Sequence, residues 1–307
     1  MPARLTIHFP SAPARELVLP EGRETVVGRD PECGVAVADD RVSRRHAQLT
    51  PGPAGWTVAD LGSKNGTLVD GVPVATGRLA EPSWISFGGL IARFETVSGP
   101  VEALHEKRRR RLTTVLEVRR ELDPAVGLRE LLSRVVASTL SLANAERGFL
   151  LLAGEDGELS VAARSGLSRD DLRSSEFGGS VGAVEQALAS GRPVVRTDVR
   201  ADAELGARAS VVEGGIRALL AVPVQALDRQ IGVLYADSRR PGAAFTELDV
   251  EILGELAAQA GLAIAVARLN GELKGLAEQL AKGTGEAAPP DTWQGLLAAH
   301  AQTGVPG

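Results

Sequence analysis

The first third of the chain alternates apolar and polar residues in short runs. Between residues 4 and 97, runs such as "LTIHF", "WTVAD" and "IARFET" are separated by Gly, Pro, Asp or Asn. Such turn signals recur at intervals of about ten residues, and alternation with a period of two is the pattern of a strand with one buried face. Asp70-Gly71 is a preferred two-residue hairpin turn. The pattern therefore predicts an all-β sandwich over residues 1–98.

The period changes after residue 98. Residues 101–122 and the segment that follows space their apolar residues three and four apart, which predicts helices. The second of these helices carries one apolar stripe, made of Leu128, Leu131, Leu132, Val135 and Val136. We therefore expect a helical linker at 99–125 and a second domain at 126–270.

This second domain mixes strands with helices. Apolar runs predict strands at "RGFLLLAG", "ELSVAAR", "PVVRTDV", "IRALLAVPVQ" and "RQIGVLYADS". A helix at "SVGAVEQALASG" ends at Gly191, and a long helix over 246–280 has Thr246 as its expected N-cap. The pattern predicts a sheet with helices before and after it. Residues 271–307 are predicted to hold the helix end and a disordered tail rich in Gly, Pro and Ala.

Composition narrows the class of protein. Hydrophobic residues make up 44% and charged residues 24%, the balance of a globular protein. No apolar run approaches the roughly 18 residues of a membrane helix, and the N-terminus lacks a secretory signal pattern. The single cysteine, Cys33, excludes an internal disulfide framework and fits a reducing compartment. We expect a cytoplasmic protein that does not bind a membrane.

The charge distribution argues against a role in nucleic-acid binding. The net charge is −5 at pH 7, whereas nucleic-acid-binding domains usually carry a basic surplus. The basic run "KRRRR" at 107–111 lies among helix-forming residues. Its ordinary interpretation is the solvated face of a helix, and contact with lipid, nucleic acid or a partner is the alternative.

Three polar loops in the first domain hold side chains that suit a phosphate. "VVGRD" contains Arg29, "SRRHAQ" contains Ser43 and Arg44, and "GSKNGT" contains Lys64 and Asn65. Loops at one end of a sandwich cluster in space. A phosphate monoester has three acceptor oxygens and a charge of about −1.5 to −2. An Arg fork, a hydroxyl and N–H groups satisfy it, and an Asn amide can hold a peptide backbone.

In order and spacing, "VVGRD", "SRRHAQL" and "DLGSKNGTLVDGVPV" resemble the motifs of a forkhead-associated (FHA) domain. The resemblance implies a β-sandwich that binds phosphothreonine peptides, with Arg29 and Ser43 holding the phosphate. Arg44 and Lys64 would assist, and Asn65 would hold the peptide backbone. Three residues would be structural in this pocket: Gly28, His46 and Gly66. The alternatives are an ordinary ion pair at Arg29, a catalytic His46, and a sandwich that no longer binds phosphate.

The second domain resembles a GAF domain. The resemblance rests on "ANAERGFLLL", on "FGGSVGAVEQALASGRPVVRTD", and on the stretch from "GGIRALLAVPVQ" to "AIAVARL". It implies a central antiparallel sheet, flanking helices and a small-molecule pocket. We therefore predict a multidomain chain in which an all-β FHA sandwich precedes an α+β GAF domain.

The GAF ligand does not follow from the sequence. The Asn and Lys of the cyclic-nucleotide signature are missing near "AAFTELD", and the domain holds neither a cysteine for a bilin nor a histidine for a metal. We expect no haem and no metal. "GGSVGA" at 178–183 lacks the Gly-Lys-Ser/Thr of a P-loop, so we interpret it as the start of a helix.

The pair of domains resembles the sensory half of sigma-54-dependent regulators and adenylate cyclases, whose effector domains would have to follow Leu280. We predict a non-catalytic signalling protein, not an enzyme. It would bind a phosphothreonine protein, a Ser/Thr kinase or its substrate, and would sense a ligand or dimerise through the GAF domain. The alternatives are a cyclic-nucleotide-type receptor and the truncated sensory half of a regulator or cyclase.

The long helix also predicts a homodimer. Leu269, Leu273, Leu276 and Leu280 follow one another at spacings of four, three and four, the pattern of a short coiled coil. Such a segment is too short to be stable alone, so we expect it to act with the helix at 104–122. The apolar stripe of the helix after residue 126 also needs cover. The alternative is that the helices fold back on their own subunit.

Overall fold

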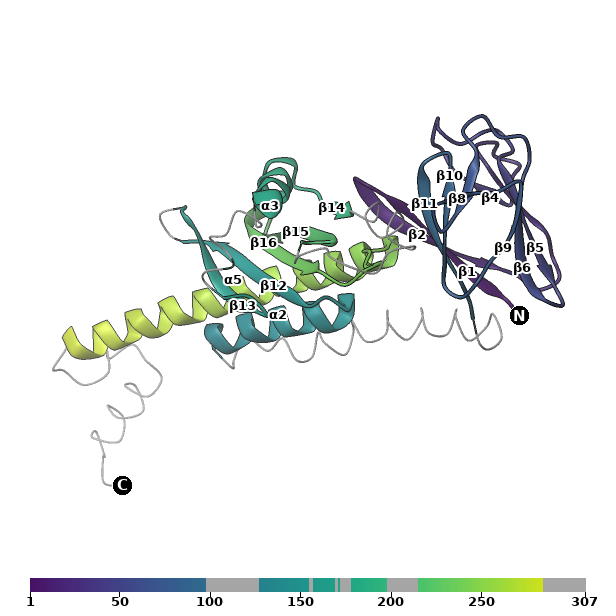
Figure 1. The fold of residues 1–307 in the computed structure, drawn as a ribbon. Coiled ribbons are helices and arrows are strands. Elements are labelled where there is room, and N and C mark those ends of the chain that lie inside the picture. Colours follow the sequence, from purple (N-terminus) through teal and green to yellow (C-terminus); the bar gives the residue numbers. More distant parts are fainter. Residues whose placement is uncertain (98–126, 155–156, 169–170, 172–177, 198–214, 284–307) are drawn as a thin grey trace, which may run out of the picture.

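The structure is a computed structural model that describes residues 1–97, 127–154, 157–168, 171, 178–197 and 215–283. An all-β domain precedes a domain of strands and helices, which confirms the predicted fold class (Figure 1). The predicted linker at 99–125, with its basic run, and the tail beyond residue 283 lie outside the described residues.

Strands β1 to β11 form two sheets, with strand orders β2-β1-β11-β10-β7-β8 and β4-β3-β5-β6-β9. Their bounds are Ala3–Phe9 (β1), Ala12–Leu19 (β2), Thr25–Gly28 (β3), Val35–Ala36 (β4), Ala47–Gly52 (β5), Gly55–Asp60 (β6), Thr67–Val69 (β7), Val72–Pro73 (β8), Thr76–Arg78 (β9), Ser83–Phe87 (β10) and Leu90–Thr96 (β11). The predicted strands are confirmed, although in the alternating run "GVAVAD" at 34–39 only Val35–Ala36 form a strand, β4. β9 is missing from the prediction because "TGR" has no apolar alternation.

The core of the sandwich follows from the alternation. Ile7 of β1, Ile85 and Phe87 of β10, and Phe94 of β11 are fully buried between the sheets. Residues between them along each strand point to the outer face. The core therefore fixes the strands, and the loops at their ends carry the polar residues.

The second domain is built on one antiparallel sheet with the strand order β13-β12-β16-β15-β14. Its elements are α2 (Leu128–Ala143), β12 (Arg147–Ala153), β13 (Leu159–Ser165), α3 (Gly178–Ser190), β14 (Val194–Thr197), β15 (Ala218–Ala226), β16 (Arg229–Ser238) and α5 (Glu247–Gly283). Leu220 and Val222 of β15 pack with α2 and α5, whereas Leu219 and Ala221 face α3. The helices therefore cover opposite faces of the sheet.

Helix α2 changes one part of the dimer prediction. Leu131, Leu132, Val135 and Val136 are buried in the domain's own core, together with residues of α5. This stripe is covered within one subunit, so it gives no support to a contact with a second copy.

Helix α5 starts as the sequence predicts. The Thr246 hydroxyl accepts a hydrogen bond from the Asp249 N–H at 3.3 Å, and Asp249 Oδ2 accepts one from the Thr246 N–H at 2.7 Å. This reciprocal cap satisfies two backbone donors at the helix start. By length and composition α5 could cross a membrane over Glu247–Leu280, but half of its apolar window is buried inside the domain, and one such helix is weak evidence of a membrane span.

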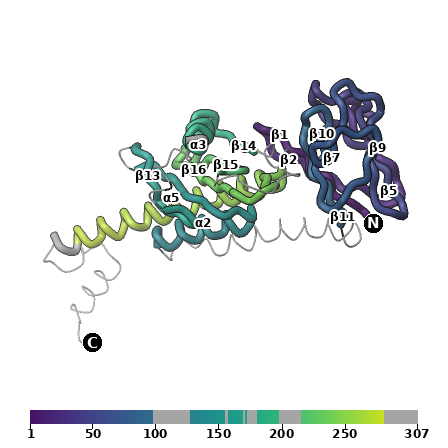
Figure 2. Tube along the Cα trace, viewed as in Figure 1, coloured from purple at the N-terminus to yellow at the C-terminus, as the bar shows by residue number. Residues whose placement is uncertain are grey.

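The two domains touch along what we call the domain seam, formed by Pro10, Ala14, Trp84 and Arg93 of the first domain and Thr197, Gly242 and Phe245 of the second. The β1–β2 hairpin reaches from the sandwich to β14 and the start of α5 (Figures 1 and 2). Thr197 N–H donates to Pro10 O at 3.2 Å, and Ala14 N–H donates to Phe245 O at 2.8 Å. The hairpin therefore extends main-chain bonding from one domain to the other.

Candidate functional site

The three polar loops meet at one end of the sandwich, as predicted. They are the β3–β4, β4–β5 and β6–β7 loops. Arg29 N–H donates to Ser43 O at 2.9 Å, and Lys64 N–H donates to Ser43 Oγ at 3.0 Å. Ser43 thus bonds both other loops. Because its oxygen already accepts the Lys64 N–H, its own hydroxyl proton is left to donate to a bound group.

His46 lies beneath these loops and is fully buried. Its Nδ1 accepts the Ser43 N–H at 3.1 Å, and its Nε2 lies 3.1 Å from Gly66 O. An acceptor at Nδ1 requires the proton on Nε2, which then donates to the Gly66 carbonyl. The ring also meets Phe87 edge-on, with centroids 5.8 Å apart. This geometry fits a bracing residue and leaves no access for a catalytic role.

The cationic side chains of the three polar loops, Arg29, Arg44 and Lys64, have different surroundings. The Arg29 side chain is 48% exposed, and its Nη1 lies 3.6 Å from Oδ1 of the fully exposed Asp40. Exposed ion pairs contribute little, so a phosphate can replace this one. Within the described part of the chain, the exposed Arg44 and Lys64 side chains have no hydrogen-bond or ion-pair partner. All three can therefore turn toward an anion.

Arg41 also lies in the β4–β5 loop, but its guanidinium already binds a carboxylate of the same loop. Its Nε and Nη2 donate to the two carboxylate oxygens of Asp39 at 2.9 and 2.7 Å. These bonds lower the pKa of Asp39. The Arg41 carbonyl instead accepts the Asn65 Nδ2–H at 2.8 Å. Asn65 keeps one N–H and its Oδ1 free of these bonds. The carbonyl and N–H groups of a peptide backbone could pair with them.

Two of the loop glycines are required by geometry. A Cβ at Gly28 would lie 2.1 Å from Arg44 O and 2.8 Å from Cys33 Sγ, so a larger residue would separate the first two loops. Gly66 has φ +75°, a conformation that favours glycine. A larger residue would therefore meet a steric clash at Gly28 and backbone strain at Gly66.

Asp60 is a loop residue that sequence reasoning missed. Its carboxylate accepts the N–H groups of Gly62 and Ser63 and the hydroxyls of Ser63 and Thr67, at 2.6 to 2.9 Å. Partial burial opposes ionisation, but these hydrogen bonds outweigh it and lower the pKa of Asp60 to about 2. The signal was the run Asp-Leu-Gly-Ser, a carboxylate followed by free loop N–H groups.

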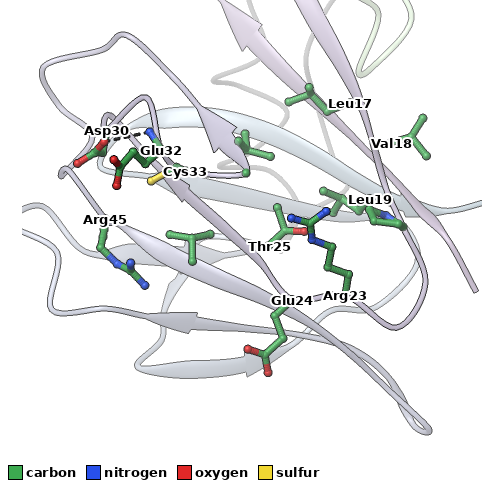
Figure 3. Close-up of a pocket in the computed structure, with 14 residues that line it drawn as sticks. Leu17, Val18, Leu19, Arg23, Glu24, Thr25, Asp30, Glu32, Cys33 and Arg45 are labelled. Carbon is green, nitrogen blue, oxygen red and sulfur yellow. Dashed lines mark hydrogen bonds between the residues drawn. The ribbon is translucent and has the colours of Figure 1, made fainter.

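A groove of about 420 Å³ opens beside the three polar loops, between the end of β2, β3 and the loop at 30–35 (Figure 3). Arg45, Asp30 and Glu32 lie at its end near the loops, and Arg23 and Glu24 at the other. Arg45 therefore faces this groove. Burial raises the pKa of the Cys33 thiol, which donates to Arg44 O, so Cys33 stays protonated.

The face of the second sheet under α3 ends in a polar cluster. The Tyr235 hydroxyl and Ser180 Oγ lie 2.6 Å apart, and Tyr235 stacks on Phe149 at 4.6 Å. Next to them Arg147 Nε donates to Asp237 Oδ1 at 2.7 Å. Burial raises the pKa of Asp237. Ser180 comes from "GGSVGA", where α3 begins at Gly178, so this motif is the start of a helix as predicted. Among the described residues, no group of three or more His, Cys, Asp or Glu side chains could hold a metal ion.

Comparison with known proteins assigns both domains. Residues 25–88 match the family model of the FHA domain, and residues 127–264 match that of the GAF domain. The chain therefore contains an FHA domain followed by a GAF domain, a combination of signalling modules. Neither class of domain is typically catalytic.

Individual relatives match one domain each. The FHA part is 38% identical over 74 residues to the FHA domain-containing protein FhaB of Mycolicibacterium smegmatis, covering 20% of this chain and 48% of that protein. It is 34% identical over 91 residues to the oxoglutarate dehydrogenase inhibitor of Corynebacterium diphtheriae, covering 30% and 61%. The GAF domain of an Acinetobacter phosphoenolpyruvate-protein phosphotransferase is 22% identical, with a TM-score of 0.40, covering 52% and 94%. The chain thus spans about half the length of the FhaB relative.

Proposed function

We propose that the FHA domain binds phosphothreonine peptides at the three loops. Arg29 holds the phosphate, the Ser43 hydroxyl donates to it, Arg44 and Lys64 assist, and Asn65 holds the peptide backbone. The observation that carries this proposal is Ser43, whose oxygen is occupied by the Lys64 N–H while its proton remains available next to Arg29. The partner is a phosphothreonine protein, either a Ser/Thr kinase or its substrate.

An array of phosphothreonine peptides tests this proposal, with threonine and phosphoserine versions of each sequence. Titration calorimetry of the best peptide against the full chain gives the affinity. We expect binding only to the phosphothreonine form. Equal affinity for the phosphorylated and unphosphorylated peptides contradicts the proposal.

The GAF domain supplies two further functions in this proposal. The buried polar cluster of Arg147, Asp237, Tyr235 and Ser180 beside an apolar core supports sensing of a small ligand, which native mass spectrometry of the purified chain would detect. The second function is dimerisation through α5. Leu262, Val266, Leu269, Leu273, Leu276 and Leu280 are 38 to 69% exposed. We call these residues the leucine stripe.

The leucine stripe fits a second copy of the chain. Its spacings of four, three, four, three and four extend the predicted pattern back by two positions, to Leu262. This alternation keeps one seam toward a neighbouring helix. The flanking positions 263, 265, 270, 272, 277 and 279 are Ala, Ala, Asn, Glu, Ala and Gln. Such flanks cause little charge repulsion between two copies.

A further inference from the structure

The outer face of the FHA sheet is covered at the domain seam. His8 alternates with core residues along β1, so it points to the outer face, yet it is only 3% exposed. Its ring lies 5.4 Å from that of Trp84. The GAF residue Gly242 lies against Trp84 and Arg93, because a Cβ there would lie 3.1 Å from Arg93 Nη1 and 3.3 Å from Trp84 Cζ2. No larger residue fits at position 242 without moving one of these side chains.

Strands β10 and β11, which contact the GAF domain through Trp84 and Arg93, also contact the three polar loops through their turn. Trp84 and Arg93 are cross-strand partners in the β10–β11 hairpin, and Gly88-Gly89 is its turn. Gly88 N–H donates to Gly66 O at 3.0 Å, and a Cβ on Gly88 would lie 2.3 Å from Arg41 O.

This turn therefore borders the atoms that position Asn65. The Arg41 carbonyl next to Gly88 is the acceptor of the Asn65 amide. Gly66 follows Asn65 directly in the sequence. Its carbonyl accepts hydrogen bonds from the Gly88 N–H and from the His46 Nε2–H. One hairpin, held in a sheet along both strands, thus contacts the GAF domain at one end and the peptide-holding residue at the other.

We infer that the domain seam regulates the phosphopeptide site, with the GAF domain holding the β10–β11 hairpin so that its turn keeps Asn65 in place for a peptide. This inference rests on the proposed phosphothreonine binding. Binding linkage is reciprocal, so a peptide that prefers the closed seam must stabilise the seam by the same factor by which the seam raises peptide affinity. The Ala14 and Thr197 amides report on the seam because they donate across it.

Two valine substitutions in the full chain separate seam contact from backbone strain. Gly242→Val places a side chain against Trp84 and Arg93, at φ +70°. Gly157→Val is the matched control, since Gly157 has φ +82° and a Cβ there would meet nothing within 4 Å. We expect Gly242→Val to speed hydrogen exchange of the Ala14 and Thr197 amides and to weaken binding of the array-selected phosphothreonine peptide by at least about fivefold, the lower end of typical couplings. Gly157→Val should do neither.

The peptide gives the reciprocal readout in the unsubstituted chain. Saturating phosphothreonine peptide should slow hydrogen exchange of the Ala14 and Thr197 amides by the factor by which the closed seam raises peptide affinity. Equal peptide affinity for Gly242→Val and the native chain, despite faster seam exchange, overturns the inference and leaves the proposed function intact. Protected seam amides in a chain that binds no phosphothreonine peptide overturn the proposed function and the inference together. If Gly242→Val does not fold, Trp84→Ala opens the seam from the FHA side and is judged by the same two measurements.

Discussion

At the scale of single residues, the FHA site is largely assembled before any ligand binds. Ser43 is bonded through its N–H, its carbonyl and its hydroxyl oxygen, and the Asn65 amide is already anchored to the Arg41 carbonyl. Groups fixed in this way lose little further conformational entropy on binding. The exposed Arg29, Arg44 and Lys64 side chains, in contrast, would have to become ordered when the proposed phosphate binds.

Arg29→Ala should remove phosphopeptide binding without unfolding the domain. Losing one partner of a charge-assisted contact costs about 2–5 kcal/mol, which is a loss of at least about 30-fold in affinity. The stability should barely change because the Arg29–Asp40 pair is exposed. Calorimetric titration and a melting curve measure the two effects, with Arg134→Ala on the surface of α2 as control. A folded Arg29→Ala protein that still binds would place the phosphate elsewhere.

Ser43→Ala and His46→Ala should distinguish a residue that contacts the phosphate from one that stabilises the loops. A hydrogen bond to a charged group contributes about 1.5–3 kcal/mol, so Ser43→Ala should weaken binding less than Arg29→Ala does. His46→Ala leaves the Ser43 N–H without its partner in a buried site and removes one of the two hydrogen bonds to the Gly66 carbonyl, which keeps the Gly88 N–H. That loss should lower the melting temperature. A His46→Ala protein with native melting but weaker binding would reverse this division of roles.

At the scale of elements, α5 has two different faces. Over its first turns one face is buried in the GAF core, including Ile252, Leu256, Ala260 and Ile264. The leucine stripe runs along another face, starting at Leu262 and continuing past Ala267, the last buried residue of the helix up to Leu280. The helix therefore serves the domain core first and presents an apolar face beyond it.

Light scattering of the full chain and of a version ending at Arg268 tests the dimer prediction. The full chain should be a dimer at tens of micromolar, and the shortened chain, which keeps only Leu262 and Val266 of the leucine stripe, should dissociate. Leu273→Glu should have the same effect by placing a charge in the stripe, whereas Lys274→Glu beside it should not. A monomeric full chain contradicts the prediction. A shortened chain that dimerises equally well moves the interface away from the stripe.

At the scale of the whole molecule, a buried histidine, His8, lies beside the domain seam with its ring against Trp84. Burial, together with the nearby Arg93 guanidinium, lowers the pKa of His8 from 6.5 to about 4. The folded chain therefore keeps His8 neutral where the unfolded chain would take up a proton. The stabilisation is complete above pH 6.5 and is lost as the pH falls toward 4.

Urea unfolding at several pH values should show this loss. A shift of that size corresponds to about 3 kcal/mol at most. Most of it should be missing by about pH 4.5, and His8→Phe should flatten the dependence because Phe does not titrate. Measurements of the two proteins should diverge most between pH 6.5 and 4. The same pH slope in both proteins would assign the acid sensitivity to another group.

Local patterns predicted both domains, most strands and the residues of the three loops. They did so because alternation and loop chemistry are properties of neighbouring residues, as at Arg29 and Ser43. The contacts of Gly88 and Asp40 with the site could not be predicted in this way, because they depend on which loops the sandwich brings together. The domain seam was missed for the same reason. His8 and Gly242 both lie against Trp84, although more than two hundred residues of chain separate them.

The contact of the β1–β2 hairpin with the GAF domain also determines what happens to the GAF sheet when the two domains are separated. β14 is a terminal strand of that sheet, and β13 is the other. In the intact chain the Thr197 N–H at the end of β14 is satisfied by Pro10 O, and Ala14 lies against Phe245 and Thr246. A GAF domain produced alone would leave the Thr197 N–H and the Phe245 carbonyl without these partners. Unpaired strand edges recruit other chains, so we expect a GAF domain produced alone to self-associate more than the full chain does.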